Sequence, residues 1–95
     1  PGQRLAIIAH NDLLASEVAS AIRSHGLVVG VDVAVAGYDD TSIAGSPEAD
    51  LTSVGQSTAQ QGSTAMNWVA SRAILTDRPA RHLSMLPSLS VRSST

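Results

Sequence analysis

The hydrophobic residues of this chain change their spacing twice within the first 37 residues, and this change limits the fold more than any other feature. Leu5–Ala9 (LAIIA) is a continuous apolar run, too short for a helix and typical of a strand covered on both faces. Residues 31–37 (VDVAVAG) form a second run rich in β-branched side chains, which predicts another strand. The chain therefore begins with two expected strands separated by a segment of different period.

The segment between the two strands has the pattern of an amphipathic helix. Apolar side chains recur at spacings of three and four, at Leu14, Val18, Ala21 and Ile22. Asn11 stands at the N-cap position, and Gly26 ends the pattern as a C-terminal cap. Strand–helix–strand units are almost always right-handed crossovers between parallel strands. We therefore expect the two strands to lie side by side in the parallel sheet of an α/β fold.

Less regular elements follow the second strand. Residues 38–50 are polar and turn-rich, which predicts a long surface loop, and residues 51–55 predict a short strand. Near the end of the chain, residues 81–86 and 89–92 alternate between apolar and polar side chains around a proline. We expect them to form a closing strand and a terminal tail.

A second helix is expected between these segments. Ser57 followed three positions later by Gln60 is a capping box, which predicts that a helix begins there and ends before Pro79. The expected apolar face consists of Ala59, Met66, Val69, Ala70, Ala73 and Ile74. Trp68 lies beside this face, and we expect it to be a partly buried packing residue rather than a stacking platform for a ligand.

Charge and composition exclude several classes of protein. The net charge is -2, and the six basic residues are all arginines scattered along the chain, so we expect this segment not to bind nucleic acid unaided. Apolar stretches fall far short of the roughly 18 to 20 residues of a membrane span, so no membrane partner is expected. The chain has no cysteine, which excludes disulfides and thiolate metal sites and favours a cytoplasmic location.

Polar residues follow both expected strands and would meet at one edge of the sheet. They are His10, Asn11 and Asp12 after the first strand, and Tyr38, Asp39 and Asp40 after the second. Ligands of open α/β sheets bind outside the carboxyl ends of the strands. A carboxylate that binds two neighbouring hydroxyls beside an amide suits a polyol such as a sugar. The same residue types are also common helix caps and loop formers, and we expect Asp12 and Asp40 to serve the backbone.

Metal binding and catalysis have little support in the sequence. His10 and the neighbouring carboxylates lack the spacing of the known metal-binding loops, and no second histidine lies near His10. There is no Gly-x-Ser-x-Gly elbow, no phosphate-binding glycine loop and no visible nucleophile for the histidines. We therefore expect no metal, no cofactor and no enzymatic activity.

Stretches that cover nearly the whole chain resemble one family in the right order. LAIIAHNDLLA (residues 5–15) is similar to the segment of lactose-repressor/galactose-repressor (LacI/GalR) regulators that ends a strand in an Asn-Asp pair and enters a helix. VDVAVAGYDDTSIA (31–44), LTSVGQ (51–56) and LPSLSVRSST (86–95) resemble the segments that follow in that family. The resemblance implies a two-lobed, type I periplasmic-binding-protein-like domain, of which residues 1–95 are part of the C-terminal lobe.

The resemblance also implies which residues would contact a ligand or a second subunit. The family's ligand-contacting positions fall at Asn11 and Asp39, and Gln56 matches a glutamine near the crossover between the lobes. His10 stands where a small residue is common and would narrow the pocket, add a hydrogen bond or be a simple loop residue. The family's dimer surface falls at positions that carry small residues here, namely Ser16, Ser20, Ser46 and Pro47.

Three functions are therefore in competition. The resemblance implies the sensor lobe of a homodimeric transcription regulator that binds a sugar-like effector and controls operator DNA binding through a helix-turn-helix headpiece. The headpiece and the N-terminal lobe would lie outside residues 1–95. The alternatives are a transport-type solute-binding protein of the same fold, which predicts a signal peptide, and a small metal-dependent enzyme. The ending LPSLSVRSST resembles the regulators and favours the first.

Overall fold

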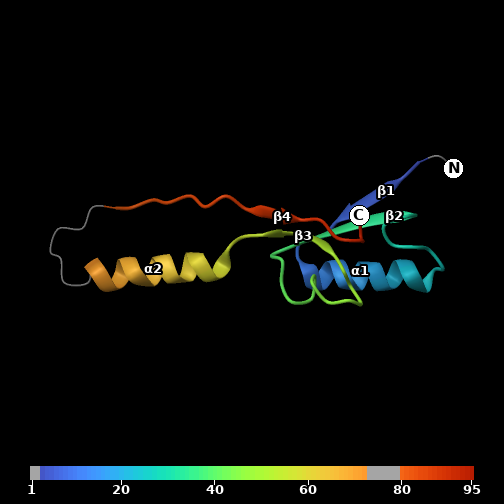
Figure 1. Cartoon of the computed structure of the whole chain (residues 1–95). Helices are drawn as coiled ribbons and strands as arrows, with labels where there is room; N and C mark the ends of the chain where they lie inside the picture. Colours follow the sequence, from blue (N-terminus) through green and yellow to red (C-terminus); the bar gives the residue numbers. More distant parts are fainter. Residues whose placement is uncertain (1–2, 73–79) are drawn as a thin grey trace.

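A computed structural model describes residues 3–72 and 80–95 and contains one mixed sheet. The elements are β1 (Leu5–Ile8), α1 (Asp12–Ser24), β2 (Val33–Tyr38), β3 (Thr52–Gly55), α2 (Thr58–Arg72) and β4 (Ser88–Ser90). The sheet order is β1-β2-β3-β4; the first three strands are parallel, and β4 pairs with β3 in the antiparallel sense (Figure 1). The predicted α/β fold and parallel pairing are confirmed. The closing strand is β4, so its prediction at residues 81–86 is wrong.

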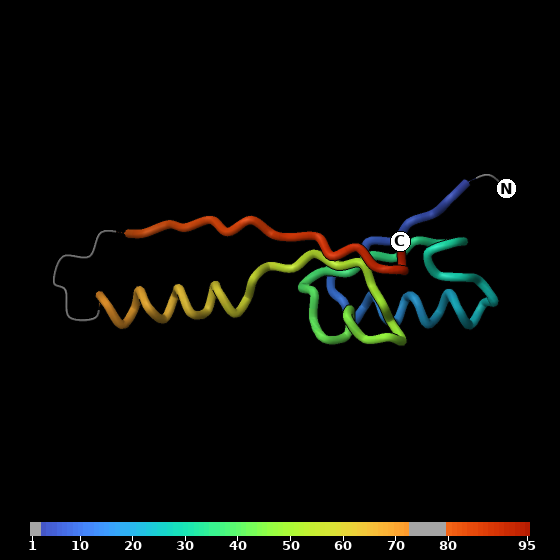
Figure 2. Tube along the Cα trace, in the orientation of Figure 1, coloured from blue at the N-terminus to red at the C-terminus, as the bar shows by residue number. Residues whose placement is uncertain are grey.

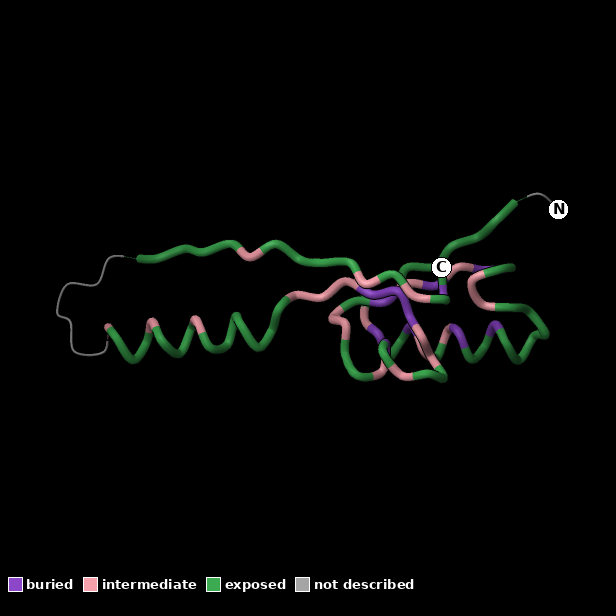
Figure 3. The backbone as a smooth tube through the Cα atoms, viewed as in Figure 1, coloured by how far each residue is buried: buried purple, intermediate pink, exposed green. Residues whose placement is uncertain are grey.

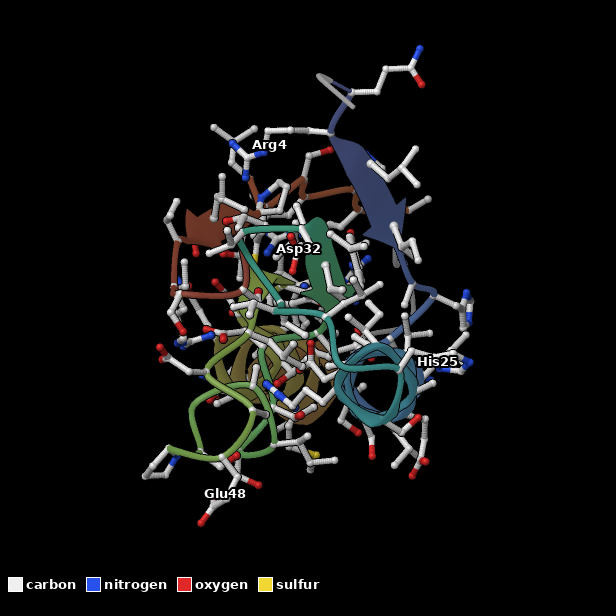
Figure 4. The ribbon with its side chains drawn as sticks, turned by 90° about the vertical axis from the view of Figure 1, so that its right-hand side faces the viewer. Arg4, His25, Asp32 and Glu48 are labelled. Atoms are coloured by element: carbon white, nitrogen blue, oxygen red, sulfur yellow. The ribbon has the colours of Figure 1, made fainter. Side chains whose placement is uncertain are left out.

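Both predicted caps of α1 are present. Asn11 has an extended backbone, and its Oδ1 accepts a hydrogen bond of 2.8 Å from the N–H of Leu14. Gly26 has a φ of +76°, a left-handed conformation that costs a glycine little, and its N–H donates to the carbonyl of Arg23. His25 lies at the same end of the helix, where its Nδ1 is 2.9 Å from the carbonyl oxygen of Ala21 (Figure 4). These local signals fix where α1 begins and ends.

The buried face of α1 is rotated from the predicted one. The apolar side chains buried on this helix are Ala15, Ala19 and Ile22. The side chain of Leu14, by contrast, is 48% exposed, and Ala21 is exposed as well. Alanines have almost no side chain, so they let the helix lie close to β2, and the larger Leu14 falls at the margin of this contact. The prediction of this face is therefore correct for Ile22 and for Val18, which is partly buried against the core, and wrong for Leu14 and Ala21.

α2 and residues 80–87, which we call the arm, extend away from the sheet (Figures 1 and 2). The described residues span 64 × 24 × 16 Å and have a radius of gyration of 18.5 Å. A compact chain of this length has a radius of gyration of about 12 Å. No residue of α2 is buried, so its predicted apolar face packs on nothing within the described part of the chain, and Ala73 and Ile74 lie outside it.

The predicted capping box at the start of α2 is wrong. Ser57 has a φ of +53°, whereas a capping serine has an extended backbone that directs its hydroxyl at the third N–H of the helix. No hydrogen bond joins Ser57 to Gln60 among the residues that the structure describes. Instead, the side chain of Gln61 donates to the carbonyl oxygen of Gln56. The first turn of α2 is thus bound to Gln56, the residue that follows β3, rather than capped by Ser57.

The core lies between α1, β2 and the loop that precedes β3 (Figure 3). Its buried apolar side chains are Ala9, Ala15, Ala19, Ile22, Val33, Val35, Ala44 and Leu51. The strand β1 contributes little, because all four of its residues are exposed, and Ile8 is 83% exposed. The prediction that this strand is covered on both faces is therefore wrong for the described residues, because β1 is an edge strand that pairs with β2 alone.

Candidate functional site

Two of the predicted ligand-contacting residues, Asp39 and Gln56, lie in direct contact. Asp39 follows β2 directly, and its N–H donates to the carbonyl of Val54 in β3 at 2.8 Å. Its φ of +94° is unusual for a residue with a side chain. Nε2 of Gln56, which follows β3, donates to Oδ1 of Asp39 at 2.5 Å. The ends of two neighbouring parallel strands thus present a carboxylate and an amide together.

These two side chains border a hollow at the junction of the sheet and the arm. The hollow has a volume of about 470 Å³ and is lined by Asp39, Asp40, residues 55–60 and Ser88. It is open, because one side is formed by the ends of the strands and another by the first turn of α2. Ligands of doubly wound sheets bind at this edge of the strands. The hollow is therefore the candidate site.

Asn11 lies at the same edge of the sheet but outside the lining of this hollow. Ile8 of β1 pairs with Ala36 of β2. Asn11 follows Ile8 by three positions and Asp39 follows Ala36 by three positions, so both lie beyond the C-terminal ends of neighbouring strands. Oδ1 of Asn11 caps α1, and its Nδ2 makes no hydrogen bond within the described residues, so it remains a donor. His10 is exposed, does not line the hollow and makes no hydrogen bond in the same part of the chain.

Asp12 lies in the first turn of α1 as predicted, but its carboxylate makes long-range contacts rather than only serving the backbone of that turn. Its carboxylate is fully buried. Oδ2 accepts hydrogen bonds from the N–H of Thr41 at 2.6 Å and from its hydroxyl at 2.8 Å, and Oδ1 accepts from the hydroxyl of Ser53 at 2.6 Å. Asp12 therefore joins α1 to β3 and to the loop after β2. Gly37 leaves room for it, because a Cβ there would lie 2.3 Å from Oδ1.

Asp40 is also structural, and its main partner was missed by the sequence analysis. Its Oδ1 lies 2.8 Å from Nη1 of Arg92, and its Oδ2 accepts from the hydroxyl of Ser90 at 3.3 Å. Its N–H donates to the hydroxyl of Ser53 at 3.0 Å. One signal for Arg92 was available, because it is the single charged side chain between residues 83 and 95.

The residues of the expected dimer surface do not line the hollow. Ser16 is half-buried on α1 and donates to the carbonyl of Leu13, while Ser20 is exposed on the same helix. Ser46 is half-buried and bonds within its own loop, and the neighbouring Pro47 is exposed. This arrangement leaves the predicted dimer contact untested.

The arm carries a separate, more apolar hollow. It has a volume of about 350 Å³ and is lined by Gln61, Thr64, Ala65, Trp68, Leu83 and Met85. The guanidinium carbon of Arg81 lies 5.5 Å from the centre of the Trp68 ring. Trp68 is half-buried, as expected for a packing residue. Within the described residues, no cluster of three or more side chains could hold a metal ion, and no helix is long and apolar enough to cross a membrane.

A family model for a periplasmic binding protein-like domain matches residues 1–95. The chain belongs to this family. It is 32% identical to the HTH-type transcriptional repressor PurR of Aliivibrio fischeri (strain MJ11) over 94% of its own length and 26% of the repressor's length. The chain therefore spans about a quarter of that relative.

Solved structures of regulators have the same fold. The CelR transcriptional regulator in complex with cellobiose superposes with a TM-score of 0.86 at 32% identity, over 95% of this chain and 28% of that chain. The Lac repressor dimer bound to operator and the anti-inducer ONPF gives 0.76 at 30% identity, over 95% and 31%. A LacI-family regulator of Lactobacillus casei with bound sucrose gives 0.80 at 26% identity, over 95% and 33%.

These relatives confirm the resemblance read from the sequence. The chain is part of an effector-binding domain of the LacI-family type, and its relatives are transcriptional repressors and regulators rather than enzymes.

Proposed function

We propose that this chain forms the C-terminal part of the effector-binding domain of a LacI/GalR-type transcription regulator and supplies one wall of a site for a sugar-like molecule. The observation that carries the proposal is the contact between Asp39 and Gln56 at the border of the 470 Å³ hollow. Both side chains leave strand ends at the edge where α/β sheets bind ligands.

The chemistry of these groups suits a polyol. Within the described residues, Oδ2 of Asp39 and Oε1 of Gln56 accept no hydrogen bond, so both are available to hydroxyl groups. Nδ2 of Asn11 is an available donor at the same edge of the sheet. Hydroxyls both donate and accept, so a carboxylate beside amides can satisfy two neighbouring hydroxyls through charge-assisted bonds. His10, which is exposed next to Asn11, would add selectivity at the margin of this site.

The relatives support the same class of ligand. CelR is described in complex with cellobiose, and the Lactobacillus casei regulator is described with sucrose. The Lac repressor dimer is described on its operator. By analogy, the full-length protein would be a cytoplasmic homodimer that binds operator DNA through a separate headpiece, with Ser16, Ser20, Ser46 and Pro47 at the dimer contact. The effector would act by its preference for one of two conformations.

The test is the thermal unfolding of the full-length protein in the presence of candidate effectors. The panel holds cellobiose, sucrose, sugar phosphates and nucleobases, and the proteins are wild type and Asp39→Asn. Asparagine is chosen because it tolerates the left-handed backbone of Asp39, so that the loss is confined to the charge. Glu48→Gln removes an exposed carboxylate of a distant loop and is the matched control (Figure 4).

A ligand at about 100 times its dissociation constant adds roughly 2.7 kcal/mol to the native state. We expect such a shift with one sugar class in wild type and Glu48→Gln, and a clearly smaller one in Asp39→Asn, whose weakened binding still saturates at higher ligand concentration. A full shift retained in Asp39→Asn would remove Asp39 from the site, and a shift with nucleobases alone would refute the sugar-like ligand. If the same ligand is the effector, it also changes operator affinity, and a titration with DNA would measure that change.

A further inference from the structure

The chain passes between the sheet and the arm twice. One crossing contacts Asp39, and the other contacts its neighbour Asp40. The outgoing crossing carries Gln56, which donates to Asp39. The returning crossing carries Ser90 and Arg92, which bind Asp40. Figure 1 shows the two crossings side by side where β3 pairs with β4. The pair Asp39–Asp40 is therefore held by residues that lie far apart in the sequence.

The backbone of this pair is held in an unfavourable conformation. Asp39 and Asp40 have φ angles of +94° and +50°, in a region that residues with side chains seldom occupy. Two such residues in succession persist only where other contacts hold them. The N–H of Asp39 is held by Val54 and that of Asp40 by Ser53, both in β3.

The carboxylate of Asp40 depends strongly on Arg92. Its Oδ1 is buried and accepts no hydrogen bond within the described residues, so its partner there is the charge of Arg92, 2.8 Å away. A buried carboxylate oxygen without a partner is strongly unfavourable. If the guanidinium were removed, Oδ1 of Asp40 would lose its partner and the side chain would turn toward water, which would displace the left-handed backbone that Asp40 shares with Asp39 against its hydrogen bonds to β3.

Arg92 is itself fixed in place by β3 and the residue before it. Its Nη1 also donates to the carbonyl of Leu51 at 2.6 Å, and its backbone N–H donates to the hydroxyl of Thr52 at 2.8 Å. The arginine and aspartate side chains are only 23% and 25% exposed, so solvent screens the pair weakly. The guanidinium is thus a rigid support rather than a mobile surface charge.

We propose that Arg92 is a positioning residue of the effector site, which holds the carboxylate of Asp39 toward Gln56 by fixing Asp40. This inference rests on the proposed function, because it gives Arg92 a role in effector affinity without direct contact to the effector. A purely structural arginine would change stability alone, whereas a positioning residue changes the contact between Asp39 and Gln56 and acts on affinity through Asp39.

The first experiment needs no effector. The full-length protein is labelled with ¹⁵N on glutamine, and the side-chain amide signal of Gln56, assigned from its loss in Gln56→Glu, is compared among variants. In Arg92→Met we expect this signal to move to the position of a free glutamine amide, and Arg92→Lys restores most of the shift. Arg4→Met is the matched control. Arg4 also donates to a carbonyl, that of Gly30, but it lies next to the N-terminal end of β1, whereas the candidate site lies beyond the C-terminal ends of the strands (Figure 4).

The second experiment measures affinity by calorimetry, with cellobiose and sucrose as probes. We expect Arg92→Met to weaken binding about tenfold, which corresponds to about 1.4 kcal/mol. In an Asp39→Asn background the same change adds no further loss, because both act through one contact. Asp40→Asn is the substitute if Arg92→Met fails to fold. Asparagine tolerates the left-handed backbone of Asp40, and the change weakens the Arg92–Asp40 ion pair by removing the charge of the aspartate.

The outcomes separate this inference from the proposed function. An unmoved Gln56 signal in Arg92→Met and Asp40→Asn overturns the inference, as do additive losses in the double variant or an equal effect of Arg4→Met. If neither probe binds the wild type, this result counts against the proposed sugar-like effector. The Gln56 signal still decides whether Arg92 positions Asp39, because that experiment uses no effector.

Discussion

Replacement of Asp12 should be among the most destabilising single changes to this fold. The side chain is fully buried and accepts three hydrogen bonds, two from Thr41 and one from Ser53. A hydrogen bond to a charged group contributes about 1.5 to 3 kcal/mol. At the low end of that range, Asp12→Ala should lower the free energy of unfolding by about 4.5 kcal/mol, because it leaves three donors without an acceptor.

Asp12→Asn separates the hydrogen bonds from the loss of volume. The amide oxygen can still accept from Thr41, while the amide nitrogen faces the hydroxyl of Ser53, which can turn to accept from it. We therefore expect a smaller loss, of about 1 to 2 kcal/mol. Urea unfolding of the full-length protein measures both values from the midpoint and slope of the transition of this lobe.

Glu17→Ala is the control, since Glu17 is an exposed carboxylate on the same helix. It should change the free energy of unfolding by no more than about 0.5 kcal/mol. The reasoning is refuted if Asp12→Ala falls within about 1 kcal/mol of the wild type, or if Asp12→Asn is as damaging as Asp12→Ala.

Three further predictions concern packing and pH. Gly37→Ala would place a Cβ 2.3 Å from Oδ1 and 3.2 Å from Cα of Asp12, and should lower the free energy of unfolding by about 2 to 3 kcal/mol. A Cβ at Gly62 in α2 would meet nothing within 4 Å, so Gly62→Ala should raise the free energy of unfolding by about 0.5 to 1 kcal/mol. The urea midpoints of Gly37→Ala and Gly62→Ala should therefore shift in opposite directions, and shifts in one direction would contradict this geometry. Hydrogen bonds from the side chain and backbone of Ser93, with the charge of Arg92, hold the pKa of Asp50 below its ordinary value of 3.8. Its contribution to stability is therefore present above pH 3.8 and is lost as the pH falls through the lower folded-state pKa. Asp50→Asn should lower the Tm at pH 7, and the difference from wild type should vanish in strong acid; a difference that stays constant with pH, or an equal effect of Glu48→Gln, would speak against it.

The local elements of this protein were predictable because their signals involve neighbouring residues. Asn11 caps a helix whose first N–H groups lie within three positions, and Gly26 ends it by a conformation of its own backbone. The strands on either side were visible as apolar runs, and the handedness of crossovers makes them parallel. The strand-end location of Asp39 followed from the same argument.

The contact between Asp39 and Gln56 was beyond the sequence pattern alone, although the family resemblance singled out both residues. This contact depends on the register of β2 against β3 and on the left-handed backbone of two residues, Asp39 and Ser57. No local sequence pattern predicted either feature. The failed capping box at Ser57 has the same origin, since the end of β3 decides how α2 begins.

Sequence periodicity by itself determined the order of elements, the parallel pairing of the first two strands and the edge where polar groups gather, because these follow from spacing within a few residues. The tertiary structure alone decided which face of α1 is buried, that β1 stays exposed and that β4 returns antiparallel. It also decided that Asp12 meets Ser53 across 41 positions and that the returning crossing brings Arg92 to Asp40. Such partners are set by sheet register and by the path of the arm, and no local pattern in the sequence encodes either.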